Sequence, residues 1–279
     1  MTATLSENIR QFYDASSLLW EGVWGEHMHH GFYGLEGKRK TERRQAQVDL
    51  IEELLAWGEV QEACQILDVG CGIGGSTLYL AEKFQAQATG ITLSPVQANR
   101  ATERAQEAGL PAEFQVADAL HMPFEDESFD FVWTLESGEH MPEKPKFLQE
   151  CYRVLKPGGT LLMATWCHRS IETQPLEAQE QALLQKIYKV YHLPYIVSLP
   201  EYAAIATQLP LKNIRTTDWS DAVAPFWGEV IRSSLNPKVI WGILQAGWGT
   251  LQGALAMRYM SQGYREGVVR FGLLCGTKE

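Results

Sequence analysis

Short apolar runs alternate with longer polar segments over the middle of the chain, from Gln65 to Trp166. Such runs, rich in β-branched and aromatic side chains, are typical of strands, and the polar segments between them have the length of helices. This alternation predicts a mostly parallel sheet covered by helices on both faces, which is a doubly wound α/β fold. The expected strands are QILDVG, QATGITL, AEFQVA, FDFVWTL and GTLLMATW.

The segments between these strands carry helix signals. Ser94 stands before Pro95, and a serine N-cap followed by proline at the first helical position is a typical helix start. We expect this helix to run to residue 108. Two more connecting helices are expected at about 74–84 and 144–155, the second one stopped by the proline and glycines of LKPGG.

The pattern is less regular on both sides of this region. Two helices are expected before it, at about 5–19 and 40–57, joined by the histidine-rich and aromatic segment EGVWGEHMHHGFYG. After it we expect helices at about 176–191 and 199–208, then the strand KNIRTTDW and a last strand VVRFGLLC.

An uncharged stretch from Val239 to Met257 has the length of a membrane span. Four glycines and two glutamines interrupt it, so we expect a buried or lid-like amphipathic helix instead. Aromatic residues crowd the same part of the chain, where they form either a lid over a greasy ligand or the core of a helical layer. They are Trp219, Phe226, Trp227, Trp241 and Trp248.

The charge balance argues against nucleic acid as a partner. The 279 residues include 24 Lys and Arg and 34 Asp and Glu, a net charge of −10, which repels phosphate backbones. The five cysteines form no CxxC pair, which fits a reducing compartment. The N-terminus has the features of neither a signal peptide nor a transit peptide, so we expect a cytoplasmic protein.

A glycine-rich loop, ILDVGCGIGG from Ile66 to Gly75, joins the first expected strand to a helix. Glycines without a Cβ let the backbone approach a nucleotide-like ligand closely. The spacing of Gly70, Gly72 and Gly75 also satisfies GxGxxG, the dinucleotide fingerprint. The loop alone therefore does not decide between NAD and S-adenosylmethionine.

Three further features favour S-adenosylmethionine. A dehydrogenase would place an acid at the end of the second strand to hold the ribose, and Thr92 stands there instead. Asp118, just beyond the third strand, is well placed to accept a hydrogen bond from an adenine amino group. The segment VLKPGG precedes the fifth strand. A tight turn at the loop and a helix-capping Asp118 are the plainer readings, but they do not explain the ordered set.

In this order, the glycine loop, the acid-bearing turn and the KPGG turn resemble the seven-strand class of S-adenosylmethionine methyltransferases. The resemblance implies a Rossmann-like sheet of seven strands with an added helical lid. It divides the chain into an N-terminal helical cap (1–60), a cofactor-binding core (61–168) and a helical substrate lid with the last strands (169–279). The cofactor contacts that it implies are Asp68, Gly70, Cys71, Gly72, Gly74, Asp118, Ala119 and Leu135.

The segment GITLSPVQ resembles a variant found in tocopherol methyltransferases, their plant N-methyltransferase relatives and cyclopropane fatty acid synthases. In that variant a glutamine one turn into the helix reaches the ribose. The resemblance gives this role to Gln97, assisted by Thr92 and the main chain of Leu93. A surface glutamine is the alternative.

Two segments on the acceptor side, residues 12–33 and 135–144, are also similar to tocopherol methyltransferases, and the similarity extends over nearly the whole chain. The reaction of that family is methylation of a chromanol ring carbon, from γ- to α-tocopherol or from δ- to β-tocopherol, with S-adenosylhomocysteine as the second product. A methyl-phytyl-benzoquinol, an alkaloid nitrogen or a small amine is the alternative acceptor. A cofactor-binding scaffold without catalysis is the alternative outside the enzymes.

Methyl transfer to a carbon next to a phenol calls for a base near the hydroxyl. His140, Glu136 and Glu139 follow the fourth strand, at the carboxyl edge where parallel sheets present ligands. His140 has the natural pKa for a base at neutral pH, and either glutamate could orient it or take the proton. A packed histidine and a capping glutamate are the plainer readings.

The remaining candidates lie in the N-terminal half and in the lid. His27, His29 and His30 lack partner Cys or Asp residues, so we expect pocket lining and no metal. Tyr13 and Tyr33 are candidates for contacts with the cofactor, either through their hydroxyls or as aromatic faces for the sulfonium. The acceptor is expected to be a lipophilic phenol, and a peripheral contact with a membrane fits such a substrate. The expected substrate contacts are Trp24, His29, His30 and Trp227.

Overall fold

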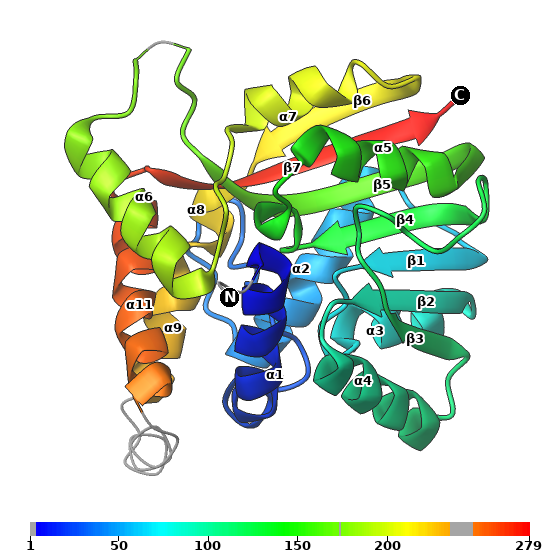
Figure 1. Cartoon of the computed structure of the whole chain (residues 1–279), viewed down its shortest axis with the longest axis horizontal. Coiled ribbons are helices and arrows are strands. Elements are labelled where there is room, and N and C mark those ends of the chain that lie inside the picture. The colour runs from blue at the N-terminus through cyan, green and yellow to red at the C-terminus, as the bar shows by residue number, and fades with distance from the viewer. Residues whose placement is uncertain (1–3, 173, 235–247) are drawn as a thin grey trace.

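The computed structural model describes residues 4–172, 174–234 and 248–279. Its centre is one sheet of seven strands in the order β3-β2-β1-β4-β5-β7-β6 (Figure 1). The first five strands in this order pair in parallel, and β7 runs antiparallel to both of its neighbours. The doubly wound, mostly parallel fold expected from the sequence is confirmed. The strands are β1 (Gln65–Val69), β2 (Gln87–Thr92), β3 (Ala112–Val116), β4 (Phe129–Leu135), β5 (Leu155–His168), β6 (Leu211–Asp218) and β7 (Val269–Lys278).

Helices pack on both faces of this sheet because each central strand is apolar on both sides. In β1, Ile66 belongs to the apolar cluster with Leu50 and Leu54 of α2, and Leu67 belongs to the cluster with Phe147 of α5. The helices are α1 (Leu5–Trp24), α2 (Arg43–Gly58), α3 (Gly75–Phe84), α4 (Pro95–Ala108), α5 (Lys144–Val154), α6 (Ala178–Tyr191), α7 (Leu199–Ala206), α8 (Ser220–Val223), α9 (Pro225–Ser234) and α11 (Trp248–Arg265), with the 3-10 turn η1 (Gly138–His140) after β4.

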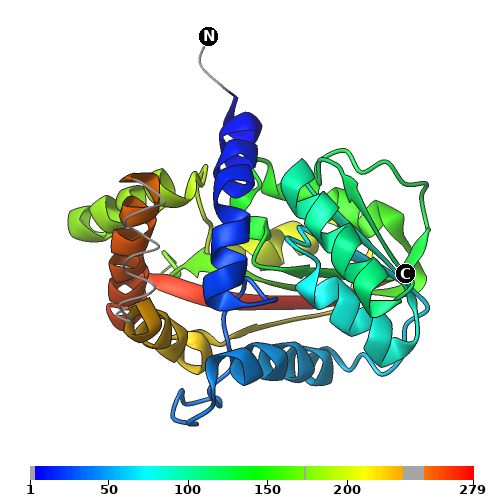
Figure 2. The same cartoon turned by 90° about the horizontal axis from the view of Figure 1, so that it is seen from below.

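Three helices, α6, α9 and α11, stand together beyond the carboxyl ends of the parallel strands (Figure 1). Helix α1 lies between this group and α4, as the view from below also shows (Figure 2). The division of the chain into three parts stays a prediction. The sheet itself crosses the boundary at residue 168, because β7 pairs with β5 from Thr160 to His168.

The boundaries of several helices differ from those expected, for local reasons. Helix α1 continues through Gly22 and ends before Gly25, whose φ of 90° does not fit a helix. Helix α2 starts at Arg43 because the Glu42 carboxylate caps it by accepting hydrogen bonds from two backbone N–H groups. The Ser94 cap is confirmed, since its hydroxyl accepts a hydrogen bond from the Gln97 N–H at 3.1 Å.

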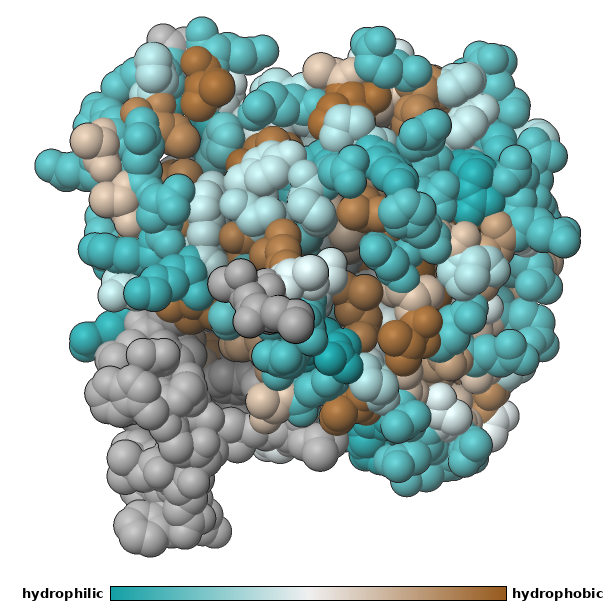
Figure 3. All heavy atoms as spheres, viewed as in Figure 1, coloured by the Kyte–Doolittle hydropathy of each residue, from teal (hydrophilic) through white to brown (hydrophobic). Residues whose placement is uncertain are grey.

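Residues 235–247, which include Trp241 and the first part of the uncharged stretch (239–247), lie outside the described residues. Among the helices of the described ranges, none is long and apolar enough to cross a membrane. Hydrophilic residues cover much of the face seen in Figure 3, and apolar residues lie scattered among them. Most large apolar side chains are inside, although Leu35 and Val116 are exposed.

Candidate active site

The glycine loop after β1 turns sharply at the carboxyl edge of the sheet. Gly70 has a φ of 85°, and a Cβ there would overlap the side chain of Ser137. Gly74 has a φ of 81°, and its Cβ would lie 2.8 Å from the ring of Phe114. Both positions therefore require glycine, because φ is positive and a neighbour occupies the space of a side chain. The loop can approach the turn after β4 only without these atoms.

A cavity of about 980 Å³, partly open to solvent, lies above this loop. At the glycines a ligand can approach the backbone closely, and Asp118 adds a carboxylate to the wall. These features fit a nucleoside with an amino acid tail. Ten of the predicted cofactor contacts line it, namely Asp68, Gly70, Cys71, Gly72, Thr92, Leu93, Gln97, Asp118, Ala119 and Leu135.

Two predicted cofactor contacts do not line this cavity. Gly74 caps the start of α3 and shapes the loop from behind. Tyr33 is buried, and its backbone N–H donates a hydrogen bond to the carbonyl oxygen of Ala222 at 2.8 Å. The geometry thus gives Gly74 a role in the turn, and it does not support a contact between Tyr33 and the cofactor.

Asp68 and Asp118 differ in their surroundings. Asp68 is buried at the end of β1, where its carboxylate accepts a hydrogen bond from Thr77 Oγ1 at 2.6 Å. Burial raises its pKa to about 7, against the lowering effect of that hydrogen bond. Asp118 follows β3, and its Oδ1 accepts a hydrogen bond from the Leu120 N–H at 2.9 Å. This bond holds the Asp118 carboxylate in place at the wall of the cavity.

The predicted ribose group is tied to α1. Thr92 Oγ1 donates to Gln97 Oε1 at 2.7 Å, and Gln97 Nε2 donates to Ser17 Oγ at 3.0 Å. One turn away, Ser94 Oγ donates to the Asp14 carboxylate at 2.5 Å. Helix α1 therefore covers this end of the cavity through polar contacts. Local sequence patterns do not reveal these contacts, because residues 80 positions apart form them.

A second cavity, of about 730 Å³ and also partly open to solvent, lies between α1 and helices α6, α9 and α11. Its walls are largely aromatic and apolar, with Phe12, Trp166, Tyr191, Phe226, Trp227 and Met257 among them. Five residues line both cavities and so form a shared wall: Tyr13, Met28, His29, Glu136 and His140. Two sites that are separated only by this wall suit the transfer of a small group from one ligand to another.

His140 and Tyr13 form a pair in the shared wall. Tyr13 Oη and His140 Nε2 lie 2.8 Å apart, and the two rings meet edge to face. Burial, with smaller effects from Lys144 and His192, lowers the pKa of His140 to about 3, so its imidazole is neutral at neutral pH. Burial and the negative charge of Glu139 raise the pKa of the Tyr13 hydroxyl.

Glu136 accepts three hydrogen bonds at the second cavity. Its Oε1 accepts from the His30 N–H at 2.6 Å, and its Oε2 accepts from His30 Nδ1 at 2.8 Å and from Trp166 Nε1 at 2.9 Å. Burial acts to raise the pKa of Glu136, but the positive charge that His30 carries when protonated, together with its hydrogen bonds, outweighs burial and lowers the pKa. Such a carboxylate is a poor proton acceptor for a substrate and a good anchor for a neighbouring side chain.

The pKa of Glu139, in contrast to that of Glu136, is raised. Burial, then the charge of Glu136, raises its pKa to about 8, and Thr165 Oγ1 donates to its Oε2 at 2.7 Å. At neutral pH this raised pKa favours the protonated form of Glu139, which is a poor proton acceptor. The turn that carries it is fixed by Lys144, whose Nζ donates to the carbonyl oxygens of Gly138 and Glu139 at 2.8 and 3.0 Å.

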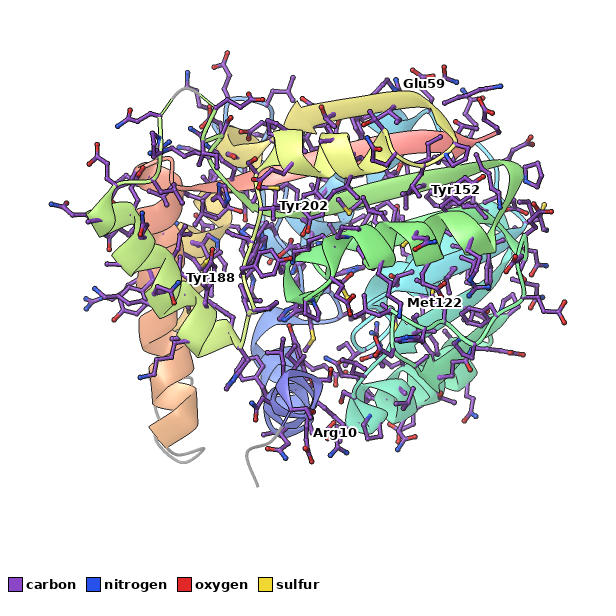
Figure 4. The ribbon with its side chains drawn as sticks, turned by 45° about the horizontal axis from the view of Figure 1, so that its top comes forward. Arg10, Glu59, Met122, Tyr152, Tyr188 and Tyr202 are labelled. Atoms are coloured by element: carbon purple, nitrogen blue, oxygen red, sulfur yellow. The ribbon has the colours of Figure 1, made fainter. Side chains whose placement is uncertain are left out.

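Tyr202 supports the same turn from α7 (Figure 4). Its hydroxyl donates a hydrogen bond to the Gly138 carbonyl oxygen at 3.2 Å. Sequence reasoning missed both supports, Lys144 and Tyr202. Lys144 follows the LESGEHM turn closely and offered a weak local signal, whereas Tyr202 lies 64 positions away and offered none.

The predicted substrate contacts fall into two groups. His29, His30 and Trp227 line the second cavity, as expected for an acceptor site. Trp24 ends α1, and its side chain lies outside the described residues. Of the aromatic residues proposed for a lid, Phe226 and Trp227 line the cavity, Trp219 packs on Phe32 instead, and the side chain of Trp248 is not described.

No group of three or more His, Cys, Asp or Glu in ranges 4–172, 174–234 and 248–279 is arranged to hold a metal ion.

The second cavity also includes residues that the sequence did not single out, chiefly Trp166 and Tyr191. Trp166 lies near the end of β5, so the rule that ligands bind at the carboxyl edge was the available signal for it.

Comparison with known proteins agrees with this geometry. A family model described as a methyltransferase domain matches residues 67–163. The structure of geranyl diphosphate C-methyltransferase from Streptomyces coelicolor, solved with S-adenosyl-L-homocysteine, superposes with a TM-score of 0.77 at 20% identity, covering 100% of this chain and 99% of that one. The fold and the site define a class I S-adenosylmethionine-dependent methyltransferase, an enzyme that uses this cofactor.

Full-length relatives narrow the class. The chain is 48% identical to a probable tocopherol O-methyltransferase of Oryza sativa subsp. japonica, covering 98% of this chain and 78% of the relative. It is 45% identical to the tocopherol O-methyltransferase of Arabidopsis thaliana, covering 99% and 83%. The chain belongs to the tocopherol methyltransferase family. Both relatives are chloroplastic, and the cytoplasmic location expected from the N-terminus stays a prediction.

Proposed function

We propose that this enzyme methylates the chromanol ring of tocopherols at a carbon next to the hydroxyl, from γ- to α-tocopherol and from δ- to β-tocopherol. The observation that carries the proposal is the wall shared by the two cavities, formed by Tyr13, Met28, His29, Glu136 and His140. The glycine loop and Asp118 line one side of it, and an aromatic chamber lies on the other. Family membership supports this choice of acceptor.

The residues of the first cavity hold the cofactor, which supplies an activated methyl group bound to a sulfonium. We assign Asp118 the hydrogen bond from the adenine amino group, and Gln97 and Thr92 the contact with the ribose; all three line this cavity. The ring of Tyr13 and the thioether of Met28 stand in the shared wall, where an aromatic face favours the positive sulfonium. Asp68 and the glycines shape the loop around the amino acid tail.

The residues of the second cavity align the acceptor and exclude water. Trp166, Phe226 and Trp227 offer flat apolar surfaces for an aromatic ring. His140, whose imidazole is neutral at neutral pH, lies in the shared wall next to the place of transfer. We assign it the ring proton, which must leave the carbon that has gained the methyl group. A weak base is sufficient there, because loss of this proton restores the aromatic ring.

A phytyl-tailed acceptor resides in membranes, so the proposal includes a peripheral membrane contact near helices α6, α9 and α11. Phe226 and Trp227 of α9 belong to the wall of the second cavity, which places this helix at the acceptor side. Flotation of the protein with phospholipid vesicles, with and without γ-tocopherol in the bilayer, tests the contact. Protein that stays at the bottom of the gradient in both cases argues against it.

Incubation of the enzyme with labelled S-adenosylmethionine and γ-tocopherol tests the function. We expect label in α-tocopherol with a free phenol, and no label when α-tocopherol, which has no open ring position, replaces the acceptor. A tail-free chromanol shows how much the tail contributes. Since the two plant relatives are named for transfer to oxygen, the product's free hydroxyl must be checked. A methyl ether, or methylation only of a quinol or amine, would overturn the proposal.

A further inference from the structure

One ring nitrogen of His30 is hydrogen-bonded, and the other has no hydrogen-bond partner among the described residues. Its Nδ1 lies 2.8 Å from Glu136 Oε2, and the side chain is only 1% exposed. An ionised carboxylate accepts hydrogen bonds and donates none, so Nδ1 carries a hydrogen in this pair. His30 Nε2 is buried, and it has no hydrogen-bond partner among the described residues. His30 lines the second cavity, so the free nitrogen belongs to the acceptor site.

The surroundings of His30 are almost entirely aromatic. The rings of Phe226, Trp227 and Tyr264 have centroids 5.1, 5.2 and 5.4 Å from that of the imidazole. A polar atom left unpaired among such side chains is costly, whereas a ligand hydroxyl that reached it would remove the cost. Trp227, which lines the same cavity, also has a buried Nε1 without a hydrogen-bond partner in the described part of the chain. An apolar chamber with a few unpaired polar atoms suits a phenol.

Glu136 fixes the direction in which His30 points. The carboxylate binds the backbone N–H and Nδ1 of His30, and Trp166 Nε1 holds it from the side. Glu136 itself has a φ of 55°, an uncommon conformation for a residue with a side chain. The pair therefore has the arrangement of a general base and its orienting acid, in which the acid selects the tautomer.

We propose that His30 Nε2 binds the hydroxyl of the acceptor and takes its proton, and that Glu136 is the positioning residue. This inference rests on the proposed function, because it assumes a phenolic acceptor in the second cavity. It separates the roles of His30 and His140. His30 acts on the oxygen, while His140, whose Nε2 is already engaged by Tyr13, acts at the shared wall where the methyl group arrives.

The proton and electron changes balance as follows. The hydroxyl proton moves to His30 Nε2, which leaves a phenolate and an imidazolium next to the Glu136 carboxylate. The ring carbon then forms a bond to the methyl carbon as the bond from that carbon to sulfur breaks, and the electron pair stays on sulfur. The ring proton leaves to His140 Nδ1, which has no hydrogen-bond partner among the described residues, and then to solvent. The imidazolium of His30 returns its proton to the oxygen.

Binding of two tail-free ligands in the presence of S-adenosylhomocysteine tests the contact. One is the chromanol, and the other is the same chroman with hydrogen in place of the hydroxyl, which removes the group without adding bulk. We expect the wild-type enzyme to bind the chromanol at least about 10-fold more tightly, and His30→Asn to bind both within about 2-fold. Asparagine keeps a donor for Glu136 and deletes the free ring end. Equal binding of both ligands to the wild type would overturn the proposal.

Activity measurements separate the two roles. His30→Asn should lower kcat by about 10²- to 10⁴-fold. Glu136→Gln should lower kcat at least about 10-fold while the wild-type preference for the chromanol over its hydroxyl-free analogue remains, since His30 is still present. If Glu136→Gln lost both kcat and the preference for the chromanol, Glu136 would have only a structural role. If His30→Asn kept the wild-type kcat, the assignment of His30 as the base would be overturned.

His168→Asn is the matched control. His168 is also buried, its Nδ1 bonds to a backbone oxygen, and its Nε2 lies 3.6 Å from the Glu201 carboxylate, but it lines neither cavity. We expect this variant to keep activity and ligand preference. Thermal stabilisation by S-adenosylhomocysteine reports folding, and if His30→Asn does not fold, the wild-type ligand comparison and Glu136→Gln decide. If the wild type methylates no chromanol, the proposed function fails; if it does so without the ligand preference, only the role of His30 fails.

Discussion

Tyr13 and His140 stand 127 positions apart in the chain, and their Oη and Nε2 atoms lie 2.8 Å apart in the wall between the two cavities. Tyr13 comes from α1, which is not part of the sheet, and His140 comes from the turn after β4. The wall is thus assembled from the central fold and from a helix laid across it. The sheet alone would provide the cofactor loop but only half of the place of transfer.

Tyr13→Phe should separate the contribution of the Tyr13 hydroxyl from that of its ring. The variant keeps the aromatic packing against His140 but leaves His140 Nε2 buried without its partner. We expect the free energy of unfolding to fall by about 1–3 kcal/mol and kcat to fall by about 10-fold or more. Urea unfolding and methyl transfer assays measure the two effects. Tyr152→Phe on α5, far from α6 in Figure 4, is the control and should change stability by less than about 0.5 kcal/mol.

Asp118→Ala and His140→Asn should have opposite effects. Asp118 lines the cofactor cavity away from the shared wall, so its loss should weaken S-adenosylhomocysteine by about 10-fold or more and change kcat at saturating cofactor much less. His140→Asn should lower kcat by about 10²- to 10⁴-fold with nearly unchanged cofactor affinity. Calorimetric titration and steady-state kinetics give the two quantities. If each variant altered both quantities equally, these role assignments would be wrong.

Glu139→Gln should change how stability depends on pH. The folded-state pKa of Glu139 is raised to about 8 from the usual 4.5. Between these values the folded state holds a proton that the unfolded state has released, so this group makes folding less favourable as pH rises. Glutamine resembles the protonated form and does not titrate. We expect the two proteins to be similarly stable near pH 4.5, and the variant to gain a relative advantage on the order of a few kcal/mol by about pH 8.

Urea unfolding at a series of pH values between these limits gives this difference directly. The exposed Glu113 on β3, changed to glutamine, serves as the matched control in the same series. A difference between Glu139→Gln and the wild type that stayed constant over the range would show that the buried carboxyl does not hold a proton in the folded protein.

Gly70→Ala and Gly109→Ala compare crowding with backbone strain. Both glycines have positive φ, 85° and 63°, but a Cβ at Gly109 meets nothing within 4 Å while a Cβ at Gly70 overlaps Ser137. The strain alone should cost about 1–2 kcal/mol at either position. Ser137 is held by hydrogen bonds to Thr134 and to the Val69 carbonyl oxygen, so it cannot easily yield. We expect Gly70→Ala to lose cofactor binding and Gly109→Ala to keep it, as titration with S-adenosylhomocysteine will show.

The local parts of this fold and site could be predicted from the sequence. Strand and helix periods, the Ser94 cap and the glycine loop are each encoded within a few neighbouring residues. The rule that ligands bind at the carboxyl edge of a parallel sheet then brings Asp118 and the turn with His140 to the same place. These inferences need no knowledge of how distant segments pack.

The rest depends on packing that one sequence does not reveal. The pairing of Tyr13 with His140 and of His30 with Glu136 is set by where α1 and the following loop settle on the sheet. The protonation states of Glu136 and Glu139 also follow from their neighbours, since both carboxyls are buried and Glu136 is hydrogen-bonded to His30, whereas Glu139 is close to the charge of Glu136. At neutral pH Glu136 is therefore ionised, whereas the protonated form is favoured for Glu139, three positions away.

Helix α1 ties the two chambers together mechanically. The same helix bonds to Ser94 and Gln97 at the nucleoside end and sends Phe12 and Tyr13 into the acceptor chamber. A displacement of α1 that opens the first chamber must also withdraw a wall of the second. Exchange of the spent cofactor by such a displacement would therefore also take the acceptor site apart.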